Sequence, residues 1–432
     1  MDYQEALTKL HSLMTFGIHP GLERIRELAR RLGDPQLRLP KVIHVAGTNG
    51  KGSVCAMLEA ILQAQGFKTG LFTSPHLHSH TERYRVNGQP MPEADFAGHF
   101  SRVYAAIEEM TAAGLASPTE FEAVTALALL WFAESGVDVA ILEAGMGGRD
   151  DSTNIVDAPI AVITNIGMDH MAYLGNTIPD IAENKADIIK PGATAITAAE
   201  GVALDIIRDT AGKRGAELLA LGQQIICKPL SLEAGKSCFD LHTASGDYRK
   251  LVIHLTGQHQ LANAALAVQG AELAGAGENA IRRGLQKAVW PARLEIIRKD
   301  PLILLDGAHN YQGMQTLCAA LERFWADKRI VCVLAMLGDK EKEQCLDLLL
   351  PYTDKLIITR SPYLSRSGDW QSLADYAESK GAAVCRAEQV GDALNLALSQ
   401  LPEDGLLLVC GSLYMVAEAR TLLLGEENSD DI

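Results

Sequence analysis

The sequence predicts an α/β protein in which mostly parallel sheets are covered by helices on both faces. Apolar runs of strand length alternate with amphipathic segments of helix length along almost the whole chain, and this alternation is typical of parallel sheets. The chain has 432 residues, of which 47% are hydrophobic, so it is long enough and apolar enough to bury more than one core. We therefore expect two domains of this class.

The first sheet is expected from four buried apolar runs with helical patterns between them. Residues 53–65 and 120–134 are examples of these helices, because their apolar residues recur at helical spacing. At residues 218–255 the pattern changes to short polar–apolar alternation with turn signals, which predicts a small antiparallel excursion. A helix is expected next, over residues 259–274. The four expected strands are residues 42–46, 69–72, 137–142 and 159–163.

A segment with two prolines and a cluster of charges, residues 290–301, separates this series from a second one. We place the boundary near residue 295. The first domain then covers residues 1–294, a smaller Rossmann-like domain covers residues 295–425, and the polar tail 426–432 is expected to be disordered. The strands expected in the second domain are residues 302–305, 330–336, 355–359, 382–385 and 405–410.

Composition and charge argue against several classes of protein. A formal net charge of −15 does not fit a basic surface for nucleic acid. The longest apolar runs have strand length, far below the roughly 20 residues of a membrane helix, and the amino terminus lacks the layout of a secretory signal. The eight cysteines show no paired spacing, which is typical of free thiols in a reducing cytosol. We expect a cytoplasmic monomer.

The run GTNGKGS directly follows the first expected strand and precedes an amphipathic helix. Glycines let successive backbone N–H groups point at phosphate oxygens, and the helix N-terminus adds positive potential. Lys51 would reach the β- and γ-phosphates of ATP. Gly52 stands where the general pattern has a hydroxyl, and Ser53 comes one place later. The run predicts an ATP site in a first domain like that of the P-loop NTPases, made by Gly47, Thr48, Asn49, Gly50, Lys51, Gly52 and Ser53.

Polar residues follow two further strands of the same sheet. Glu143 ends the strand 137–142, where a carboxylate would hold Mg²⁺ beside the phosphates, and Arg149 follows in a glycine-rich loop that could bind an anion. His170 follows the strand 159–163 at the same edge, where ligands bind in open α/β sheets. Lys185 lies in a helical segment, and from the residues alone it is interpreted as a solvated helical lysine.

Two other site types receive little support from the sequence. The cluster HLHSH, residues 76–80, contains alternating histidines but lacks a cysteine or an H-E-x-x-H context, so it is a weak signal for zinc. The sequence contains no G-x-S-x-G motif and no reactive-cysteine signature. Nucleophilic catalysis by the protein is therefore not expected.

Taken together, these segments resemble the folylpolyglutamate synthases, which are often bifunctional with dihydrofolate synthase and belong to the wider Mur ligase family. The resemblance covers nearly the whole chain and keeps the order of the segments. The segments that carry it are FGIHPGLERI, HVAGTNGKGS, TSPHL, ERYRVNG, TEFE, ILEAGMGGRDDSTNIV, NIGMDHMAYLGNTIPDIAENKADIIKPG, QLANAALA, WPARLE, LLDGAHN, LGDKE and VCGSLY.

The resemblance implies roles for matching residues. Ser74, Glu143 and His170 would coordinate Mg²⁺, with two ions expected, and Lys185 matches a lysine that the family commonly carries as a carbamate, a further oxygen ligand. Lys51, Lys185 and His170 are the expected catalytic residues. The segment around this lysine is often E-K-A-G in the family, whereas this chain has Asn184 and Asp187. The remaining residues expected at the nucleotide are Asn263, Arg293, Asp306 and His309.

Two segments face the pterin in bifunctional relatives. They differ here from the frequent T-Y-F-E and R-L-D-A-T-N, because this chain has TEFE and RDDSTN. Polyglutamylation is therefore expected more firmly than dihydrofolate synthase activity. The residues expected at the pterin are Thr119, Glu120, Phe121, Glu122, Asp150, Asp151 and Ser152.

The resemblance implies an ATP-dependent amide ligase that adds L-glutamate to a folate through an acyl phosphate. The acceptor would be a reduced folate such as tetrahydrofolate, or dihydropteroate. A peptidoglycan Mur-type ligase is the first alternative, and we disfavour it because only about 45 residues precede Gly47, too few for a separate nucleotide-sugar domain. The second alternative is a P-loop binding protein that hydrolyses ATP as a switch, but it leaves the second domain without a role.

Overall fold

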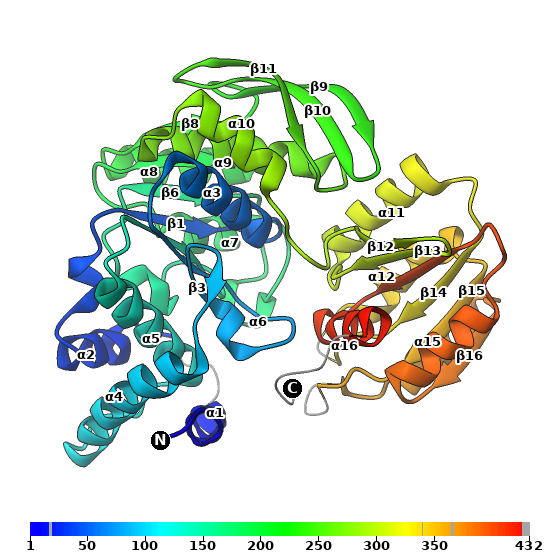
Figure 1. Cartoon of the computed structure of the whole chain (residues 1–432), viewed down its shortest axis with the longest axis horizontal. Helices are drawn as coiled ribbons and strands as arrows, with labels where there is room; N and C mark the ends of the chain where they lie inside the picture. The colour runs from blue at the N-terminus through cyan, green and yellow to red at the C-terminus, as the bar shows by residue number, and fades with distance from the viewer. Residues whose placement is uncertain (17–19, 339, 364–366, 426–432) are drawn as a thin grey trace.

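The computed structural model describes residues 1–16, 20–338, 340–363 and 367–425. It has two large sheets and one small sheet, each covered by helices (Figure 1), and the α/β prediction is confirmed. The tail predicted at 426–432 lies outside the described residues. Within the described ranges, no helix has both the length and the apolar character needed to cross a bilayer.

The first sheet has eight strands in the order β4-β3-β2-β5-β1-β6-β7-β8. The six strands from β2 to β8 in this order are parallel, while the hairpin β3–β4 adds an antiparallel edge. The strands are β1 (Val42–Ala46), β2 (Thr69–Phe72), β3 (Tyr84–Val86), β4 (Gln89–Pro90), β5 (Val139–Glu143), β6 (Ile160–Ile163), β7 (Thr194–Thr197) and β8 (Glu217–Ala220).

Alternate residues of these strands enter different cores, as the pleat of a sheet requires. Ile43 and Val45 pack with helices α3, α9 and α10, while Val42 packs with α1, α2, α4 and α5 on the other face. Helices α7 and α8 cover the far part of that second face. The helices are α1 (Tyr3–Ser12), α2 (Glu23–Arg31), α3 (Lys51–Gln65), α4 (Glu93–Ala112), α5 (Glu120–Ser135), α6 (Met171–Leu174), α7 (Ile178–Ala186), α8 (Gly201–Lys213), α9 (His259–Ala274) and α10 (Glu278–Lys287).

The antiparallel excursion is shorter than the sequence suggested. It consists of β9 (Ile226–Glu233), β10 (Lys236–His242) and β11 (Asp247–Ile253), whereas residues 217–220 form β8 and extend the large parallel sheet. Leu219 of β8 is buried in the main core, so this short run gains more apolar contact beside β7 than it would in an exposed hairpin. The three strands pack on α9 and α10 (Figure 1).

The second large sheet has six strands in the order β12-β13-β17-β14-β15-β16, and only β12 is antiparallel to its neighbour. Residues 295–299, expected as part of a boundary segment, form β12 because Ile296 and Ile297 pack on opposite faces of this sheet. The strands are β12 (Glu295–Lys299), β13 (Leu302–Asp306), β14 (Ile330–Leu334), β15 (Lys355–Thr359), β16 (Val384–Ala387) and β17 (Leu406–Cys410). The helices are α11 (Tyr311–Trp325), α12 (Lys342–Leu349), α14 (Gln371–Ser379), α15 (Val390–Ser399) and α16 (Leu413–Leu424).

We call the part with the first two sheets the first domain and the part with the six-stranded sheet the second domain. The two lie side by side and are joined by the segment between α10 and β12 (Figure 1). Polar contacts link the loops after β1 and β6 in the first domain to the start of α11 in the second. The carboxyl ends of strands from both domains therefore meet, which is where a ligand site is expected in α/β folds.

Candidate active site

The run predicted to bind phosphate, residues 47–53, which we call the phosphate loop, leads from β1 into α3 through positions that only glycine fits. Gly47 has a φ of +144°, and a Cβ there would lie 1.8 Å from Oγ1 of Thr164. Gly50 has a φ of +87°, and a Cβ there would lie 2.5 Å from Oδ1 of Asn263 in α9. The loop is thus enclosed by the end of β6 on one side and by α9 on the other, so its backbone has little freedom to move.

Hydrogen bonds to the segment after β6 fix the curl of the loop. The backbone N–H of Thr48 donates to the carbonyl of Asn165 over 2.9 Å, and the N–H of Asn49 donates to Oδ1 of the same residue over 2.8 Å. The Thr164 hydroxyl donates to the carbonyl of Asn49 over 2.6 Å. The sequence did not single out Thr164 or Asn165, although both directly follow an expected strand.

Gly52 stands where the general phosphate-loop pattern has a hydroxyl residue, and the structure gives a steric reason for the glycine. A Cβ at this position would lie 2.6 Å from the indole ring of Trp290, which belongs to the segment joining the two domains. The following residue, Ser53, is buried, and its hydroxyl accepts a hydrogen bond from Nε2 of Gln260 over 3.3 Å. Asn263, predicted at the nucleotide, donates to Oε1 of Gln260 over 3.0 Å.

Two lysines converge on the carbonyl oxygen of Gly47. Nζ of Lys51 donates to it over 3.1 Å and Nζ of Lys185 over 2.9 Å. Lys185 is only 3% exposed, so the interpretation as a solvated helical lysine is wrong. Burial, with the nearby charge of Lys51 adding to it, lowers the pKa of Lys185 to about 7. Two amine groups are therefore gathered beside the loop in a protein that is acidic overall.

Glu143 ends β5 as a buried carboxylate beside Ser74. The backbone N–H of Ser74 donates to Oε2 of Glu143 over 3.2 Å. Burial raises the pKa of Glu143, while the charges of Lys51 and Arg293 favour its ionised form. The structure thus brings together Ser74, Glu143 and Lys51, and their role at a metal ion stays a prediction.

The residues present fit a hard cation that is shared with a substrate. Among the described residues, no group of three or more His, Cys, Asp and Glu side chains is arranged to hold a metal ion. Mg²⁺ in nucleotide sites usually takes one or two protein carboxylates and completes its shell with phosphate oxygens and water. Glu143 and the Ser74 hydroxyl supply oxygen atoms of this kind next to the phosphate loop.

The histidines of the segment 76–80 do not form a zinc site. His76 accepts a hydrogen bond from Nε of Arg83 over 2.9 Å. His78 points toward the second domain, where its ring nitrogens lie 3.2 Å from Nη1 of Arg420 and 3.0 Å from Oγ1 of Thr421. The segment therefore contributes to packing between the domains.

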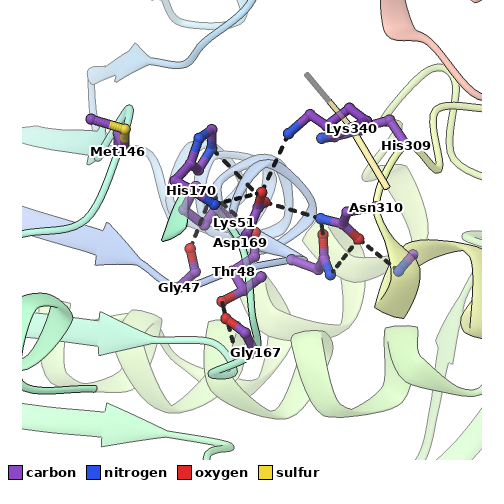
Figure 2. A network of polar contacts seen from close by, with 12 residues as sticks. Gly47, Thr48, Lys51, Met146, Gly167, Asp169, His170, His309, Asn310 and Lys340 are labelled. Atoms are coloured by element: carbon purple, nitrogen blue, oxygen red, sulfur yellow. Dashed lines mark hydrogen bonds and ion pairs between the residues drawn. The ribbon is translucent and has the colours of Figure 1, made fainter. Parts of the chain in front are cut away.

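The loop after β6 joins the two domains through the carboxylate of Asp169 (Figure 2). Nδ2 of Asn310 donates to Oδ2 of Asp169 over 3.1 Å, and Nζ of Lys340 lies 3.3 Å from Oδ1. Nδ2 of Asn310 also donates to Oδ1 of Asn49 in the phosphate loop over 3.2 Å. His170 lies alongside, with Nε2 3.8 Å from Oδ2 of Asp169. The second domain therefore reaches the phosphate loop directly.

His170 is held as a neutral imidazole at neutral pH. Partial burial lowers its pKa, the charge of Lys340 adds to this effect, and the carboxylate of Asp169 opposes it. A neutral ring nitrogen has a lone pair with which to bind a cation. The geometry is thus compatible with the predicted role of His170 as a metal ligand.

Of the predicted second-domain residues, Asp306 uses its carboxylate to hold backbone. One oxygen accepts the N–H of Leu294 and the other accepts the N–H of Ala308, each over 2.8 Å. Arg293 stands next to it, and a Cβ on Gly307 would lie 2.4 Å from Nη1 of Arg293. Asp306 therefore fixes the junction of the domains and the loop that carries His309.

His309 follows this junction on the same loop. Its Nδ1 lies 2.9 Å from the carbonyl of Gly307. Burial, with the charge of Lys340 adding to it, lowers the pKa of His309 to about 4. The ring is therefore neutral at neutral pH, and it lies beside Lys340 on the side of the second domain that faces Asp169 (Figure 2).

Several residues predicted at the pterin are engaged within the protein. Thr119 and Glu122 form a capping box at the start of α5, in which Glu122 accepts the backbone N–H of Thr119 over 2.7 Å. Glu122 also lies 3.1 Å from Nε of Arg24. Ser152 is buried, with its hydroxyl 2.6 Å from that of Thr125. These side chains hold the local fold.

The aspartates of this region differ in their exposure. Asp151 is buried, and its carboxylate accepts backbone N–H groups of Met146 over 2.8 Å and of Thr153 over 3.0 Å. Asp150, the residue before it, is exposed. Arg149 is half exposed and forms an ion pair with Asp187, so the anion-binding interpretation of Arg149 does not hold in this conformation.

Phe121 lies against the glycine-rich loop after β5, and Glu120 comes directly before it. Glu120 lies 3.5 Å from Nη1 of Arg83, and although burial opposes it, the neighbouring His80 and Arg83 lower the pKa of Glu120 to about 2. The ring of Phe121 covers Gly145, since a Cβ there would lie 2.3 Å from Cζ of Phe121. These two residues are the better candidates for contact with an acceptor.

Comparisons with known proteins agree with this architecture. The chain matches the Mur ligase middle domain over residues 45–271 and the Mur ligase glutamate ligase domain over residues 292–413. The dihydrofolate synthase/folylpolyglutamate synthase of Bacillus subtilis is 36% identical over 430 residues, which cover 98% of this chain and 99% of that relative. The folylpolyglutamate synthase of Lacticaseibacillus casei is 32% identical over 98% of this chain and 99% of its own.

The chain belongs to the folylpolyglutamate synthase group of the Mur ligase family.

Solved structures give the same result. Escherichia coli FolC in complex with DHPP and ADP superposes with a TM-score of 0.90 at 33% identity, covering 98% of both chains. Mycobacterium tuberculosis folylpolyglutamate synthase complexed with ADP superposes with a TM-score of 0.91 at 31% identity, covering 99% of this chain and 100% of that one. The chain is an ATP-dependent ligase, and the nucleotide-binding prediction is confirmed. The individual residue roles remain predictions that the geometry above supports or, for Arg149, does not support.

Asn310 and Lys340 are the main residues that the sequence analysis missed. Both lie in segments that carried the resemblance, LLDGAHN and LGDKE, and each of these segments follows an expected strand of the second domain. The rule that ligands gather at the carboxyl ends of strands could have pointed to them. Their partners Asn49 and Asp169 lie more than a hundred residues earlier, so no local pattern connects them.

Proposed function

We propose that this chain forms an amide bond between a folate carboxylate and the amino group of L-glutamate, using ATP. The observation that carries the proposal is the meeting of the phosphate loop, the two lysines Lys51 and Lys185, and the second domain at one point. Such an arrangement suits a reaction in which phosphate charge must be stabilised while a second and a third substrate are brought in.

The reaction proceeds in two displacements. An oxygen of the folate carboxylate attacks the γ-phosphorus, the bond to ADP breaks, and an acyl phosphate forms. The glutamate amine then attacks the acyl carbon, the bond to phosphate breaks, and an amide and a proton are released. Lys51 and the backbone N–H groups of the loop bind the transferred phosphoryl group, because both steps gather negative charge there.

Mg²⁺ is the expected cofactor, as two ions. Ser74, Glu143, His170 and a carbamylated Lys185 would hold it, and its contribution would be to neutralise charge on the phosphate oxygens. The burial of Glu143 beside Lys51 supports this assignment, since a buried carboxylate without a cation would be costly.

Carbamylation of Lys185 has support from its surroundings. Reaction with CO₂ needs an unprotonated amine, and the pKa of about 7 leaves much of Lys185 unprotonated near neutral pH. A carbamate would gain the charge of Lys51 as a partner and would keep one N–H for the Gly47 carbonyl. Asp187, which departs from the family pattern, is paired with Arg149 and Arg214, so its charge does not oppose the modification.

Native intact-mass measurement in bicarbonate buffer tests the carbamate. We expect a species heavier by one CO₂, which is absent from Lys185→Gln and from protein unfolded in acid. A wild-type mass that stays unmodified at high bicarbonate would remove the carbamate from the account, while the ligase proposal would stand on its own assay.

The acceptor is a reduced folate such as tetrahydrofolate, and dihydropteroate is the second candidate. Full-length similarity to the Bacillus subtilis protein, which carries both activities in its name, favours considering both acceptors. The segments TEFE and RDDSTN differ from the frequent family sequences. Within them, the side chains of Glu120, Phe121 and Asp150 take no part in the capping box of α5 or in the loop hydrogen bonds described above. We also propose that the domains divide before β12, and that the enzyme is a cytoplasmic monomer.

A panel with labelled L-glutamate decides the function. Tetrahydrofolate and dihydropteroate are supplied separately with ATP and Mg²⁺, and both labelled product and ADP are measured. We expect ADP release to require glutamate and an acceptor together. ATP hydrolysis that ignores both substrates would overturn the ligase and favour the nucleotide-switch alternative, and activity only with peptidoglycan precursors would favour the other Mur-type alternative.

A further inference from the structure

A salt bridge between the domains stands out among the contacts around the phosphate loop. Asp169 lies after β6 in the first domain and Lys340 lies after β14 in the second, with Nζ and Oδ1 3.3 Å apart. The side chains of Lys340 and Asp169 are only 10% and 12% exposed, respectively. Of the ion pairs that join two described residues, this is the one that crosses from one domain to the other.

The pair lies within a closely fitted contact. Asn310 bridges the carboxylate of Asp169 and the side chain of Asn49 in the phosphate loop. On the same loop as Asp169, a Cβ at Gly167 would lie 1.8 Å from Oε1 of Gln312 in α11. The second domain therefore approaches the phosphate loop at a point where the first domain offers both a carboxylate and a position without a side chain.

The charge of Asp169 suggests what this contact does. The carboxylate of Asp169 lies 3.8 Å from the ring of His170, and its charge acts on the amine of Lys185 beside the phosphate loop. An unpaired carboxylate in that place repels the phosphate groups of the nucleotide. Lys340 neutralises Asp169, but only when the second domain has reached the first.

We infer that Asp169 and Lys340 are positioning residues whose salt bridge couples closure of the two domains to completion of the positive phosphate site. With the domains apart, Asp169 weakens the site; with the domains together, Lys340 cancels that charge and Asn310 fixes the phosphate loop. The nucleotide would then be fully stabilised only when the second domain is in place. This inference deepens the proposed ligase function and rests on it.

A double-mutant cycle tests the inference. Lys340→Met leaves a partly buried carboxylate unpaired at the interface, so we expect kcat to fall by about tenfold or more, with a smaller change in KM for ATP. Asp169→Asn removes the opposing charge and should cost less. The double variant Asp169→Asn/Lys340→Met should recover part of the kcat lost in Lys340→Met, because no bare carboxylate remains. Lys213→Met, which breaks the exposed pair with Asp209 within α8, is the matched control and should keep wild-type kinetics.

Recovery of kcat in the double variant distinguishes a positioning role of Lys340 from direct contact of Lys340 with a substrate. If Lys340 acted on a substrate itself, removal of Asp169 would bring no recovery, and the inference would be overturned. Wild-type kcat in Lys340→Met would overturn it as well.

Small-angle scattering of the full chain with a non-hydrolysable ATP analogue gives a second measure that does not need turnover. We expect Lys340→Met to have a larger radius of gyration than wild type, and the double variant to be intermediate. Equal radii in all variants would contradict the coupling. If the wild-type enzyme made no amide at all, the proposed function would fail while the scattering result would still report on closure.

Discussion

The phosphate loop and the segments predicted to contact the acceptor, residues 119–122 and 150–152, use their polar side chains in opposite ways; we call these segments the acceptor region. In the phosphate loop, backbone bonds and glycine contacts fix the chain, and the lysine amines converge on one carbonyl from which a phosphate can draw them away. In the acceptor region, Thr119, Glu122 and Asp151 are already bonded to backbone or to other side chains. We therefore expect the phosphate-loop lysines to act in the reaction, whereas many polar residues of the acceptor region stabilise the local fold.

This difference predicts two kinds of mutant phenotype. Substitutions at the phosphate loop should change kinetics and leave stability nearly intact. Substitutions at the capping and loop residues of the acceptor region should lower stability and leave the kinetics of the folded fraction nearly intact.

The largest expected effect is that of Lys51→Ala. Lys51 is the residue that we propose to bind the β- and γ-phosphates, so we expect kcat/KM for ATP to fall by about 10³-fold or more. Its removal also relieves repulsion with Lys185, so the thermal midpoint should not fall. Product formation and differential scanning fluorimetry measure the two quantities, and retained turnover would break the distinction between the regions.

Glu122→Gln should show the opposite pattern. The change removes a largely buried charge from its pair with Arg24 and weakens the capping box of α5, which should lower the free energy of unfolding by about 2 kcal/mol. Urea unfolding measures this loss, and kcat well below the melting temperature should stay near wild type. Glu109→Gln, at an exposed pair with Arg31, is the control and should change stability by less than about 1 kcal/mol. A large rise in KM for the acceptor with unchanged stability would place Glu122 in the binding site instead.

His44 connects the two regions and gives a smaller effect that depends on pH. It lies in β1, which leads into the phosphate loop, and its Nε2 is 2.7 Å from the hydroxyl of Thr153 beyond Asp151. Burial, with the charge of Lys190 adding to it, lowers the pKa of His44 to about 3. The ordinary pKa of histidine is about 6.5, so the unfolded chain binds the proton first as the pH falls.

Neutral His44 therefore contributes stability that is fully present above pH 6.5 and is lost as the pH falls toward 3. One such proton changes the free energy of unfolding by about 1.4 kcal/mol per pH unit within that window. Urea unfolding at several pH values should show a shallower dependence in His44→Gln than in wild type. Equal slopes would mean that His44 takes up its proton without unfolding.

The fold was largely predictable because its signals are local. The runs at 42–46, 69–72 and 355–359 become strands with those bounds, and the helix at 259–274 is observed as predicted. The sequence did not predict that β8 and β12 belong to the large sheets, because the pairing of such short strands is decided by tertiary contacts with β7 and β13. The pleat and the alternation of apolar residues cannot by themselves say which sheet a short strand joins.

The site was predictable where strand, glycine-rich turn and helix follow one another, as around Lys51. It was less predictable where a motif has two meanings: TEFE is a folate-family segment, but T-x-x-E is also the pattern of a capping box, and Thr119 and Glu122 form one. The strand-end rule points only to the segments that contain Asn310 and Lys340, because their contacts form where the two domains meet. Long-range contacts of this type leave no periodic trace in the sequence.

The account depends most on the formation of an acyl phosphate at the phosphate loop. Tetrahydrofolate labelled with oxygen-18 in its side-chain carboxylate tests this step directly, with the released phosphate analysed by mass spectrometry. We expect one labelled oxygen to appear in the phosphate for each amide bond formed, because the carboxylate oxygen that attacks ATP leaves with the phosphoryl group. Unlabelled phosphate, released alongside amide product, would contradict the account.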